Sequence, residues 1–241
     1  MTFRTKNIDQ ITAVILAGGK GMRLRSVVSD KPKVLAEVNG RPFLSYLLDQ
    51  LEGNNITDVV FCSGYMADAI EAYFGDSYKS IAIKYSREET PLDTGGALRL
   101  ALPLLSSDTI LVMNGDSYVK TDLTVFVNSF FQKKHIAKML LVKVQDVSRF
   151  GIVTFNNEFK ITSFEEKGEQ KGPGWINAGI YLFEKKIISD IPKDCSYSLE
   201  RNFFPKLLDK RLFGFCTNDE FIDIGTPESY SRADCFLEKH H

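Results

Sequence analysis

Histidine is scarce in this 241-residue sequence, and the three present, His135, His240 and His241, do not stand near an obvious nucleophile. The sequence also lacks G-x-S-x-G, the motif that presents a serine nucleophile on a sharp strand-to-helix turn. Acyl transfer by a serine–histidine or cysteine–histidine pair needs such a nucleophile beside its base. The sequence therefore disfavours that class and favours a reaction that needs no nucleophile from the protein.

Cysteine is also sparse. The four cysteines have no C-x-x-C or Cys/His spacing typical of metal ligands, and two lie in apolar, strand-like runs: Cys62, Cys195, Cys216 and Cys235. This pattern is typical of reduced packing residues. No apolar run approaches the length of a membrane span, and the first ten residues are polar rather than signal-like. We therefore expect a soluble, cytoplasmic protein.

An excess of charge is missing as well, because the formal net charge is only -1. Such a balance lacks the electrostatic footprint of a DNA- or RNA-binding protein, so a cationic site has to be local. The phosphates of a small molecule fit that description better than a polyanion. With 44% hydrophobic residues, the chain is expected to form a single domain over residues 1–241 with an ample core.

The order of apolar patterns indicates an α/β fold. In the first half, strand-like runs at 11–16, 58–62, 81–85 and 109–113 alternate with helical segments at 43–51, 68–74, 96–105 and 123–131. Such βαβ units predict a mixed, mostly parallel sheet with helices on both faces. The second half is predicted to add short strands, hairpins around 156–157, and helices: strands at 139–144, 151–155, 160–164, 177–183 and 221–224, and helices at 199–208 and after 227. Residues 168–174 read as a surface hairpin or a flap.

A glycine-rich run follows the first strand. Gly18, Gly19 and Gly21 allow positive φ and a close approach of backbone N–H groups to an anion. Lys20, Arg23 and Lys33 add positive charge nearby. A dinucleotide fingerprint would need glycine where Leu24 stands, and the Gly-Lys-Ser/Thr of a P-loop does not follow. The run therefore predicts a different phosphate cradle, with an ordinary turn as the alternative.

Two carboxylates occupy similar positions after apolar runs. Asp116 follows the strand at 109–113, and Asp223 lies within the apolar segment 221–224 before a Gly-Thr-Pro turn. Ligands of open α/β sheets gather beyond the carboxyl ends of strands. The two aspartates could share one Mg²⁺, which prefers carboxylate, water and phosphate oxygens. A capping turn for Asp116 and a salt bridge for Asp223 are the structural alternatives.

Three further motifs could border the same cleft. The segment 92–97 leads into a helix, so that its N–H groups would face the cleft, and Ser63-Gly64-Tyr65 could border a base. Lys167 follows two carboxylates at the end of a strand, and Asn177 could meet a sugar hydroxyl. Each motif has a plain alternative as a loop, a cap or a packing residue.

In order and spacing these motifs resemble those of the sugar-1-phosphate nucleotidyltransferases. The resemblance spans nearly the whole chain and rests on residues 16–19, 32–33, 114–116, 166–167, 177–179 and 223–227. It implies a Rossmann-like nucleotide-diphospho-sugar transferase fold and a reaction in which an NTP and a sugar 1-phosphate give an NDP-sugar and pyrophosphate. Met22 stands where the usual signature has threonine. That difference leaves more of the phosphate grip to Arg23 and the backbone.

The resemblance also implies roles for particular residues. Arg23, Lys33 and Asp116 would be catalytic, with Mg²⁺ held by Asp116 and Asp223. The nucleotide would be bound in the half spanning 11–135, by Leu16, Ala17, Gly18, Gly19, Gly21, Ser63, Gly64, Thr94, Gly95, Gly96, Asn114 and Gly115. The sugar phosphate would be bound in the half spanning 136–241, by Glu165, Lys167, Asn177 and Gly179.

Within the family, segments 164–167 and 221–225 most resemble the D-glycero-α-D-manno-heptose 1-phosphate guanylyltransferases of bacterial surface-polysaccharide synthesis. That resemblance implies GTP as the nucleotide, and a homodimer is plausible by analogy. Mannose 1-phosphate guanylyltransferase, or a uridylyltransferase for another hexose or amino-sugar phosphate, is the near alternative. A non-catalytic nucleotide-sugar sensor is the alternative of another class, and an oxidoreductase is disfavoured by Leu24.

Overall fold

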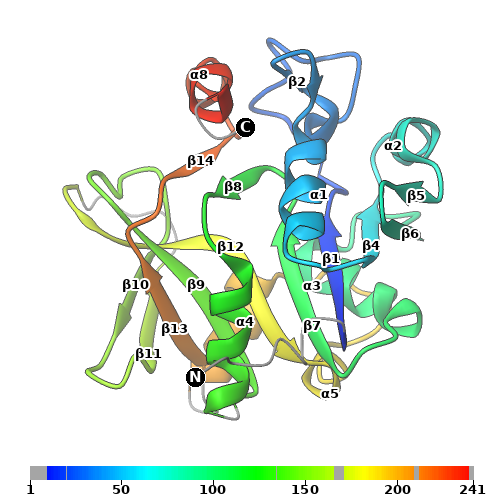
Figure 1. Ribbon diagram of the computed structural model, residues 1–241. Coiled ribbons are helices and arrows are strands. Elements are labelled where there is room, and N and C mark those ends of the chain that lie inside the picture. The colour runs from blue at the N-terminus through cyan, green and yellow to red at the C-terminus, as the bar shows by residue number, and fades with distance from the viewer. Residues whose placement is uncertain (1–9, 20, 134, 166–170, 209–211, 239–241) are drawn as a thin grey trace.

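The architecture is a mixed α/β sheet with helices packed on both faces (Figure 1). A computed structural model describes residues 10–19, 21–133, 135–165, 171–208 and 212–238, except for the side chain of Glu165. Four parallel strands form its centre, in the order β7 (Thr109–Asn114), β1 (Ile11–Leu16), β4 (Asp58–Ser63) and β6 (Ile81–Arg87). The apolar runs of β7, β1 and β4 are buried on both faces, as central parallel strands require, whereas buried and more exposed residues alternate along much of β6.

The second half extends the sheet beyond β7. The long strand β12 (Gly174–Glu184) runs antiparallel to β7, pairing Ile180 with Met113. Around it lie β9 (Ala137–Val144), β10 (Ile152–Phe155), β11 (Ile161–Glu165) and β13 (Leu212–Thr217). β10 and β11 form the hairpin predicted around residues 156–157. The short β5 (Ser77–Tyr78) closes the opposite edge beside β6.

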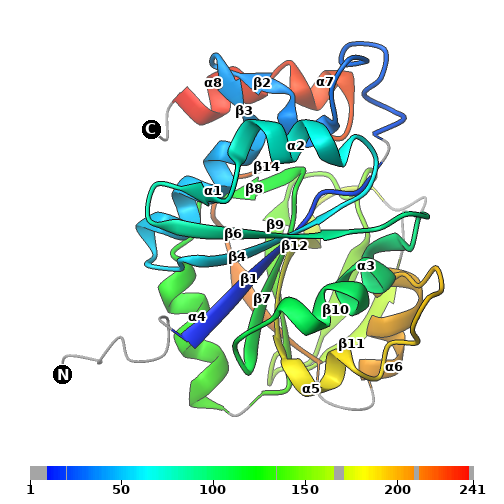
Figure 2. The same ribbon diagram turned by 90° about the vertical axis from the view of Figure 1, so that its right-hand side faces the viewer.

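Helices cover the sheet from two sides (Figure 2). One core joins one face of the sheet to α1 (Phe43–Gly53), α2 (Ala67–Phe74), α4 (Leu123–Gln132) and α8 (Ala233–Glu238). A second core joins the other face to α3 (Asp93–Ala101), α5 (Lys185–Ile188), the π-helical turn η4 (Leu199–Phe203) and α6 (Phe204–Leu208). The predicted fold class, a mixed sheet with helices on both faces, is confirmed.

Small elements refine the predicted boundaries. The helix expected at 96–105 begins at Asp93 and ends in the 3-10 turn η3 (Leu102–Leu104), and the one expected at 199–208 divides into η4 and α6. The final helix divides into α7 (Pro227–Tyr230) and α8. The strand β13, which pairs in parallel with β9, was not predicted from the sequence.

A two-stranded ladder outside the main sheet positions the two aspartates. β8 (Ser117–Val119) and β14 (Phe221–Asp223) pair so that Asp223 faces Ser117. The N–H of Ile224 donates to the Asp116 carbonyl at 2.9 Å. Residues more than a hundred positions apart in sequence are thereby neighbours. A similar small ladder, β2 (Glu37–Val38) with β3 (Arg41–Pro42), follows the 3-10 turn η2 (Lys33–Leu35).

The described part of the chain holds no helix long and apolar enough to cross a membrane. All four cysteines are free thiols, and Cys62 is buried.

Candidate active site

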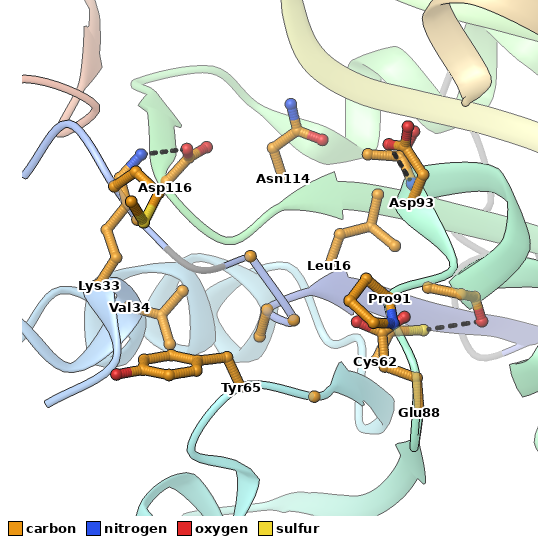
Figure 3. Close-up of a pocket in the computed structure, with 18 of the residues that line it drawn as sticks. Leu16, Lys33, Val34, Cys62, Tyr65, Glu88, Pro91, Asp93, Asn114 and Asp116 are labelled. Carbon is orange, nitrogen blue, oxygen red and sulfur yellow. Dashed lines mark hydrogen bonds and ion pairs between the residues drawn. The ribbon is translucent and has the colours of Figure 1, made fainter. Parts of the chain in front are cut away.

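A cavity of about 870 Å³ opens at the carboxyl ends of β1, β4, β6 and β7 (Figure 3). Eleven of the residues predicted for the site line it: Leu16, Ala17, Gly18, Gly19, Gly21, Arg23, Lys33, Gly64, Thr94, Asn114 and Asp116. Parallel strands that end at one edge bring these distant segments together, as expected for ligand sites in open α/β sheets.

The glycine loop lies over this cavity with little space for side chains. A Cβ on Gly18 would stand 2.7 Å from Glu88 Oε1, and one on Gly64 would stand 2.5 Å from the same oxygen. Gly21 has φ +59° and lies against the Lys33 side chain. A Cβ on Gly19 would meet nothing within 4 Å, so its backbone is open to the cavity. Lys20 falls outside the described residues.

Lys33 and Asp116 form an ion pair across the cavity (Figure 3). Lys33 begins η2 directly after Pro32, and Asp116 lies between β7 and β8. Burial opposes ionisation of the Asp116 carboxyl, but the Lys33 ammonium outweighs it and lowers the pKa of that group. Asp116 is therefore an anion at neutral pH.

Asp223 has a cationic partner that sequence reasoning missed. Arg149, in the loop after β9, donates through Nη2 to Asp223 Oδ1 at 3.2 Å. The same nitrogen donates to Thr226 Oγ1 at 3.2 Å and to Ser229 Oγ at 3.3 Å. The salt bridge left open as an alternative for Asp223 is present. The sequence around Arg149 does not indicate this contact with Asp223, because the contact depends on where β14 lies in the fold.

Gly225 marks the point where these charges converge. A Cβ there would stand 2.6 Å from Asp223 Oδ2, 3.4 Å from Lys33 Nζ and 3.5 Å from Arg23 Nη2. One small volume is thus bordered by two cations and a carboxylate, with Asp116 held by the same lysine. Within the described ranges, His, Cys, Asp and Glu never gather in threes suited to a metal ion. A metal at this place would need phosphate or water oxygens as additional ligands.

A second residue missed from the sequence is Glu88, directly after β6. It lines the cavity, and its Oε2 accepts the N–H of Leu92 at 3.0 Å. Burial raises the pKa of the Glu88 carboxyl, and the structure shows no lysine or arginine paired with it in the described ranges. The rule that ligands gather beyond strand ends could have found it, but the predicted strand stopped two residues before the end of β6.

Four residues predicted for the nucleotide do not line the cavity. The N–H groups of Gly95 and Gly96 donate to the Tyr197 carbonyl at 2.8 and 2.9 Å, because residues 195–199 pack on the first turn of α3. This corrects the expectation that they face the cleft. Gly115 packs against the Leu16 carbonyl, where a Cβ would stand 2.8 Å away. Ser63 is fully buried, and its hydroxyl has no hydrogen-bond partner in the part of the chain described.

The predicted sugar-phosphate residues are only partly described. Asn177 donates through Nδ2 to the Tyr181 hydroxyl at 2.7 Å and accepts the Gly179 N–H at 2.9 Å. Gly179, at φ +78°, approaches Asn114 so closely that a Cβ would stand 2.7 Å from Asn114 Nδ2. Lys167 and the side chain of Glu165 lie outside the described residues.

Comparison with known proteins identifies the class. Residues 12–240 match the family described as Nucleotidyl transferase, and the chain belongs to that family. It is 35% identical, over 95% of its length and 99% of the relative's, to D-glycero-alpha-D-manno-heptose 1-phosphate guanylyltransferase of Aneurinibacillus thermoaerophilus. It is 36% identical to mannose-1-phosphate guanylyltransferase of Mycobacterium tuberculosis, over 95% of the chain and 65% of that protein.

A solved structure is also similar to this chain over nearly its whole length. HddC from Yersinia pseudotuberculosis, crystallised with GMP-PN, superimposes with a TM-score of 0.83 at 36% identity. The match covers 95% of this chain and 99% of that one.

Proposed function

We propose that this protein transfers the guanylyl group of GTP to D-glycero-α-D-manno-heptose 1-phosphate and releases pyrophosphate. The observation that carries the proposal is the convergence of Arg23, Lys33, Asp116 and Asp223 beside a glycine-lined cavity. Cations and carboxylates without a protein nucleophile are what a transfer between two phosphates requires. The first relative named above carries this activity in its name and matches over nearly its full length.

In the proposed reaction an oxygen of the sugar 1-phosphate attacks the α-phosphorus of GTP. A new P–O bond forms, the bond from the α-phosphorus to the oxygen bridging the β-phosphorus breaks, and pyrophosphate leaves with the electron pair. Catalysis then rests on alignment and on neutralising charge. Arg23 and Lys33 supply positive charge, and the open backbone at Gly19 receives phosphate oxygens.

The site is suited to Mg²⁺, and we assign Asp116 and Asp223 as its ligands. The donor set fits, because two carboxylates brought together by the β8–β14 ladder are hard oxygen donors. When bound, the ion supplies positive charge to the phosphates. Lys33 and Arg149 balance the charge of the two carboxylates in the structure.

Glu88 supports guanine as the base. Its carboxylate can only accept hydrogen bonds when ionised. Guanine presents adjacent N1–H and N2–H donors, whereas uracil presents a single N–H between two carbonyl oxygens. Substituting Glu88→Gln places an amide N–H group opposite those donors. We expect this variant to lower kcat/KM for GTP by about 10–100-fold and to narrow the preference for GTP over UTP. An unchanged GTP-to-UTP ratio would refute the role of Glu88.

The second half, residues 136–241, is proposed to bind the sugar phosphate through Glu165, Lys167, Asn177 and Gly179. A lysine is a mobile point charge suited to a phosphate. Lys167→Ala should therefore raise the KM for the sugar 1-phosphate while leaving that for GTP near its original value. The product would serve as a donor for bacterial surface-polysaccharide synthesis.

Mannose 1-phosphate is the second candidate acceptor, favoured by the relative from Mycobacterium tuberculosis. The two sugars share a ring configuration and differ by one hydroxymethylene unit at C6. The test incubates the protein with GTP, Mg²⁺ and each sugar 1-phosphate, and measures pyrophosphate and the GDP-sugar by mass spectrometry. We expect equimolar products and a higher rate with the heptose. GTP binding without product from any sugar 1-phosphate would instead favour a non-catalytic sensor.

A further inference from the structure

One wall of the cavity is fastened by residues from the second half of the chain. The wall spans residues 88–94, from the end of β6 into the first turn of α3, and includes Glu88, Pro91 and Thr94. Tyr197 donates its N–H to the Leu92 carbonyl at 2.9 Å and accepts two N–H groups from the first turn of α3 at its own carbonyl. The wall is thus bonded to a segment outside the nucleotide-binding half.

The Thr94 hydroxyl takes part in this connection both as a donor and as an acceptor. Its Oγ1 donates to Glu200 Oε2 at 2.9 Å and accepts the Leu199 N–H at 2.8 Å. Ser198 Oγ donates to the same Glu200 oxygen, also at 2.9 Å. Glu200 and Leu199 belong to the π-helical turn η4. Such turns are rare in proteins, and those that occur often lie at functional sites. Glu200 therefore fixes the orientation of a side chain that lines the cavity.

Asp93, next to Thr94, has a backbone that needs support. It is a non-glycine residue at φ +60°. Such residues persist where surrounding contacts hold them, and they cluster at ligand clamps. Asp93 Oδ1 accepts the Thr94 N–H at 2.8 Å, and Oδ2 pairs with Arg201 Nη2 at 2.5 Å. Arg201, the residue that follows Glu200, thus contacts the residue of the same wall that has positive φ.

We propose that Glu200 and Arg201 are positioning residues for nucleotide binding, acting through Thr94 and Asp93. They hold the wall of residues 88–94 in the shape that receives the base. This inference rests on the proposed function, because it concerns the nucleotide end of the same cavity. It assigns control of nucleotide affinity to the half of the chain expected to bind sugar phosphate.

The test measures the dissociation constant of GTP by titration calorimetry without sugar 1-phosphate, and then KM for both substrates. Glu200→Ala should weaken GTP binding about 10-fold, with KM for the sugar 1-phosphate within about 2-fold of the original. Thr94→Val should have a similar effect. The double variant should be no weaker than the weaker single variant, because the two side chains act as one unit. Glu200→Gln keeps a carboxamide oxygen for Thr94 and Ser198, and should restore most of the affinity.

Arg99→Ala is the matched control. Arg99 also joins α3 to the second half, through Nε to the Ile191 carbonyl at 3.0 Å, but it does not line the cavity. It should lower the melting temperature and leave GTP binding unchanged. The inference fails if Glu200→Ala binds GTP like the original protein, if Arg99→Ala weakens GTP equally, or if the two losses at 94 and 200 add.

Failure of the proposed function looks different. If the original protein prefers another nucleoside triphosphate, GTP as substrate is refuted. The same variants are then titrated with the preferred nucleotide, and the expected pattern of losses is unchanged. An original protein that binds no nucleoside triphosphate overturns both proposals.

Discussion

Two aspartates at opposite ends of the central sheet both pair with lysine, yet they differ in what else they contact. Asp58, at the amino end of β4, accepts hydrogen bonds from Lys84 and Thr12, each at 2.8 Å, and from Ser106. Asp116, beyond the carboxyl end of β7, has Lys33 as its side-chain partner within the described ranges. Carboxylate oxygens offer about four acceptor sites, so Asp58 is nearly saturated and Asp116 retains spare capacity.

The pKa does not separate the two groups, because that of each carboxyl lies below its ordinary value. In both, burial raises the pKa, and it is more than offset by a neighbouring lysine together with the Ser106 and Thr12 hydroxyls at Asp58 and with Arg23 at Asp116. The two aspartates therefore differ in that Asp116 has unused hydrogen-bond acceptor sites and lies at the edge of the sheet where ligands bind. We infer that Asp58 stabilises the fold and that Asp116 serves the reaction.

The largest effect that we expect is the loss of turnover when either proposed metal ligand is replaced. Asp116→Asn and Asp223→Asn remove the proposed metal ligands and should each lower kcat/KM by about 100-fold or more. The melting temperature of Asp116→Asn should stay close to the original, because Lys33 is the side-chain partner of Asp116 in the described ranges, whereas Asp223→Asn also weakens the ion pair with Arg149 and should lower it more. Steady-state pyrophosphate release measures the first effect, and Mn²⁺ binding followed by electron paramagnetic resonance should weaken in parallel. Original activity in both purified variants would refute the metal assignment.

Replacing the lysine partners, Lys33 of Asp116 and Lys84 of Asp58, tests the same difference between the two aspartates. Lys33→Met removes a cation from the phosphate end of the cavity and should lower kcat about 100-fold. Lys84→Met removes the equivalent partner of Asp58 and should leave kcat unchanged. Because Lys84 is 43% exposed, its loss should cost no more than about 1 kcal/mol of unfolding free energy. Kinetics and urea unfolding of both variants check the pair, and equal kinetic losses would contradict the contrast.

Asp58→Asn should show the reverse of the Asp116 pattern. We expect a loss of about 1–3 kcal/mol in unfolding free energy with unchanged kcat/KM, because its hydrogen-bond partners lose a charged acceptor. The folded-state pKa of Asp58 is depressed, so its stabilisation is present above the ordinary pKa and disappears as the pH falls through the folded value. Urea titrations at pH 7 and pH 3 should therefore show a smaller penalty for the variant at pH 3.

The smallest expected effect concerns His135, which lines a cavity of about 400 Å³ away from the active site. Burial, with Lys138 and Lys133 nearby, lowers the pKa of its imidazole to about 4. The unfolded chain then binds the proton more readily, so stability falls as the pH drops below about 6.5. Between pH 6 and 5 the loss should be roughly 1 kcal/mol. His135→Phe should lack this component, and an identical pH dependence would contradict it.

The four central strands could be predicted from the sequence, because the apolar runs of β1, β4 and β7 reflect burial on both faces and β6 alternates buried with more exposed residues. β14 was also predicted, at 221–224, but its partner β8 was not, because a three-residue strand carries little pattern and the two strands pair only after the chain has folded. That ladder is what makes Asp116 and Asp223 neighbours. Their partnership was therefore a hypothesis about two separate motifs.

The same limit applies to individual site residues. Lys33 and the glycine loop lie in one short segment, so their shared role is visible locally. Arg149 contacts Asp223, 74 positions away, and Glu200 contacts Thr94, 106 positions away. Nothing beside Arg149 or Glu200 in the sequence indicates these contacts. Gly95 and Gly96 show the opposite error, a predicted ligand contact that the structure does not have. Glycines at the start of a helix suit a bound ligand, but these two pack against the backbone of residues 195–199.

The central claim is tested most directly by a matrix of pyrophosphate-release rates. GTP, UTP, CTP, ATP and dTTP are each combined with manno-heptose, mannose, glucose and amino-sugar 1-phosphates at equal concentration with Mg²⁺. We expect the highest kcat/KM for GTP with D-glycero-α-D-manno-heptose 1-phosphate. A higher value for any other pair would contradict the assigned substrates, and no release from any pair would contradict the assigned reaction.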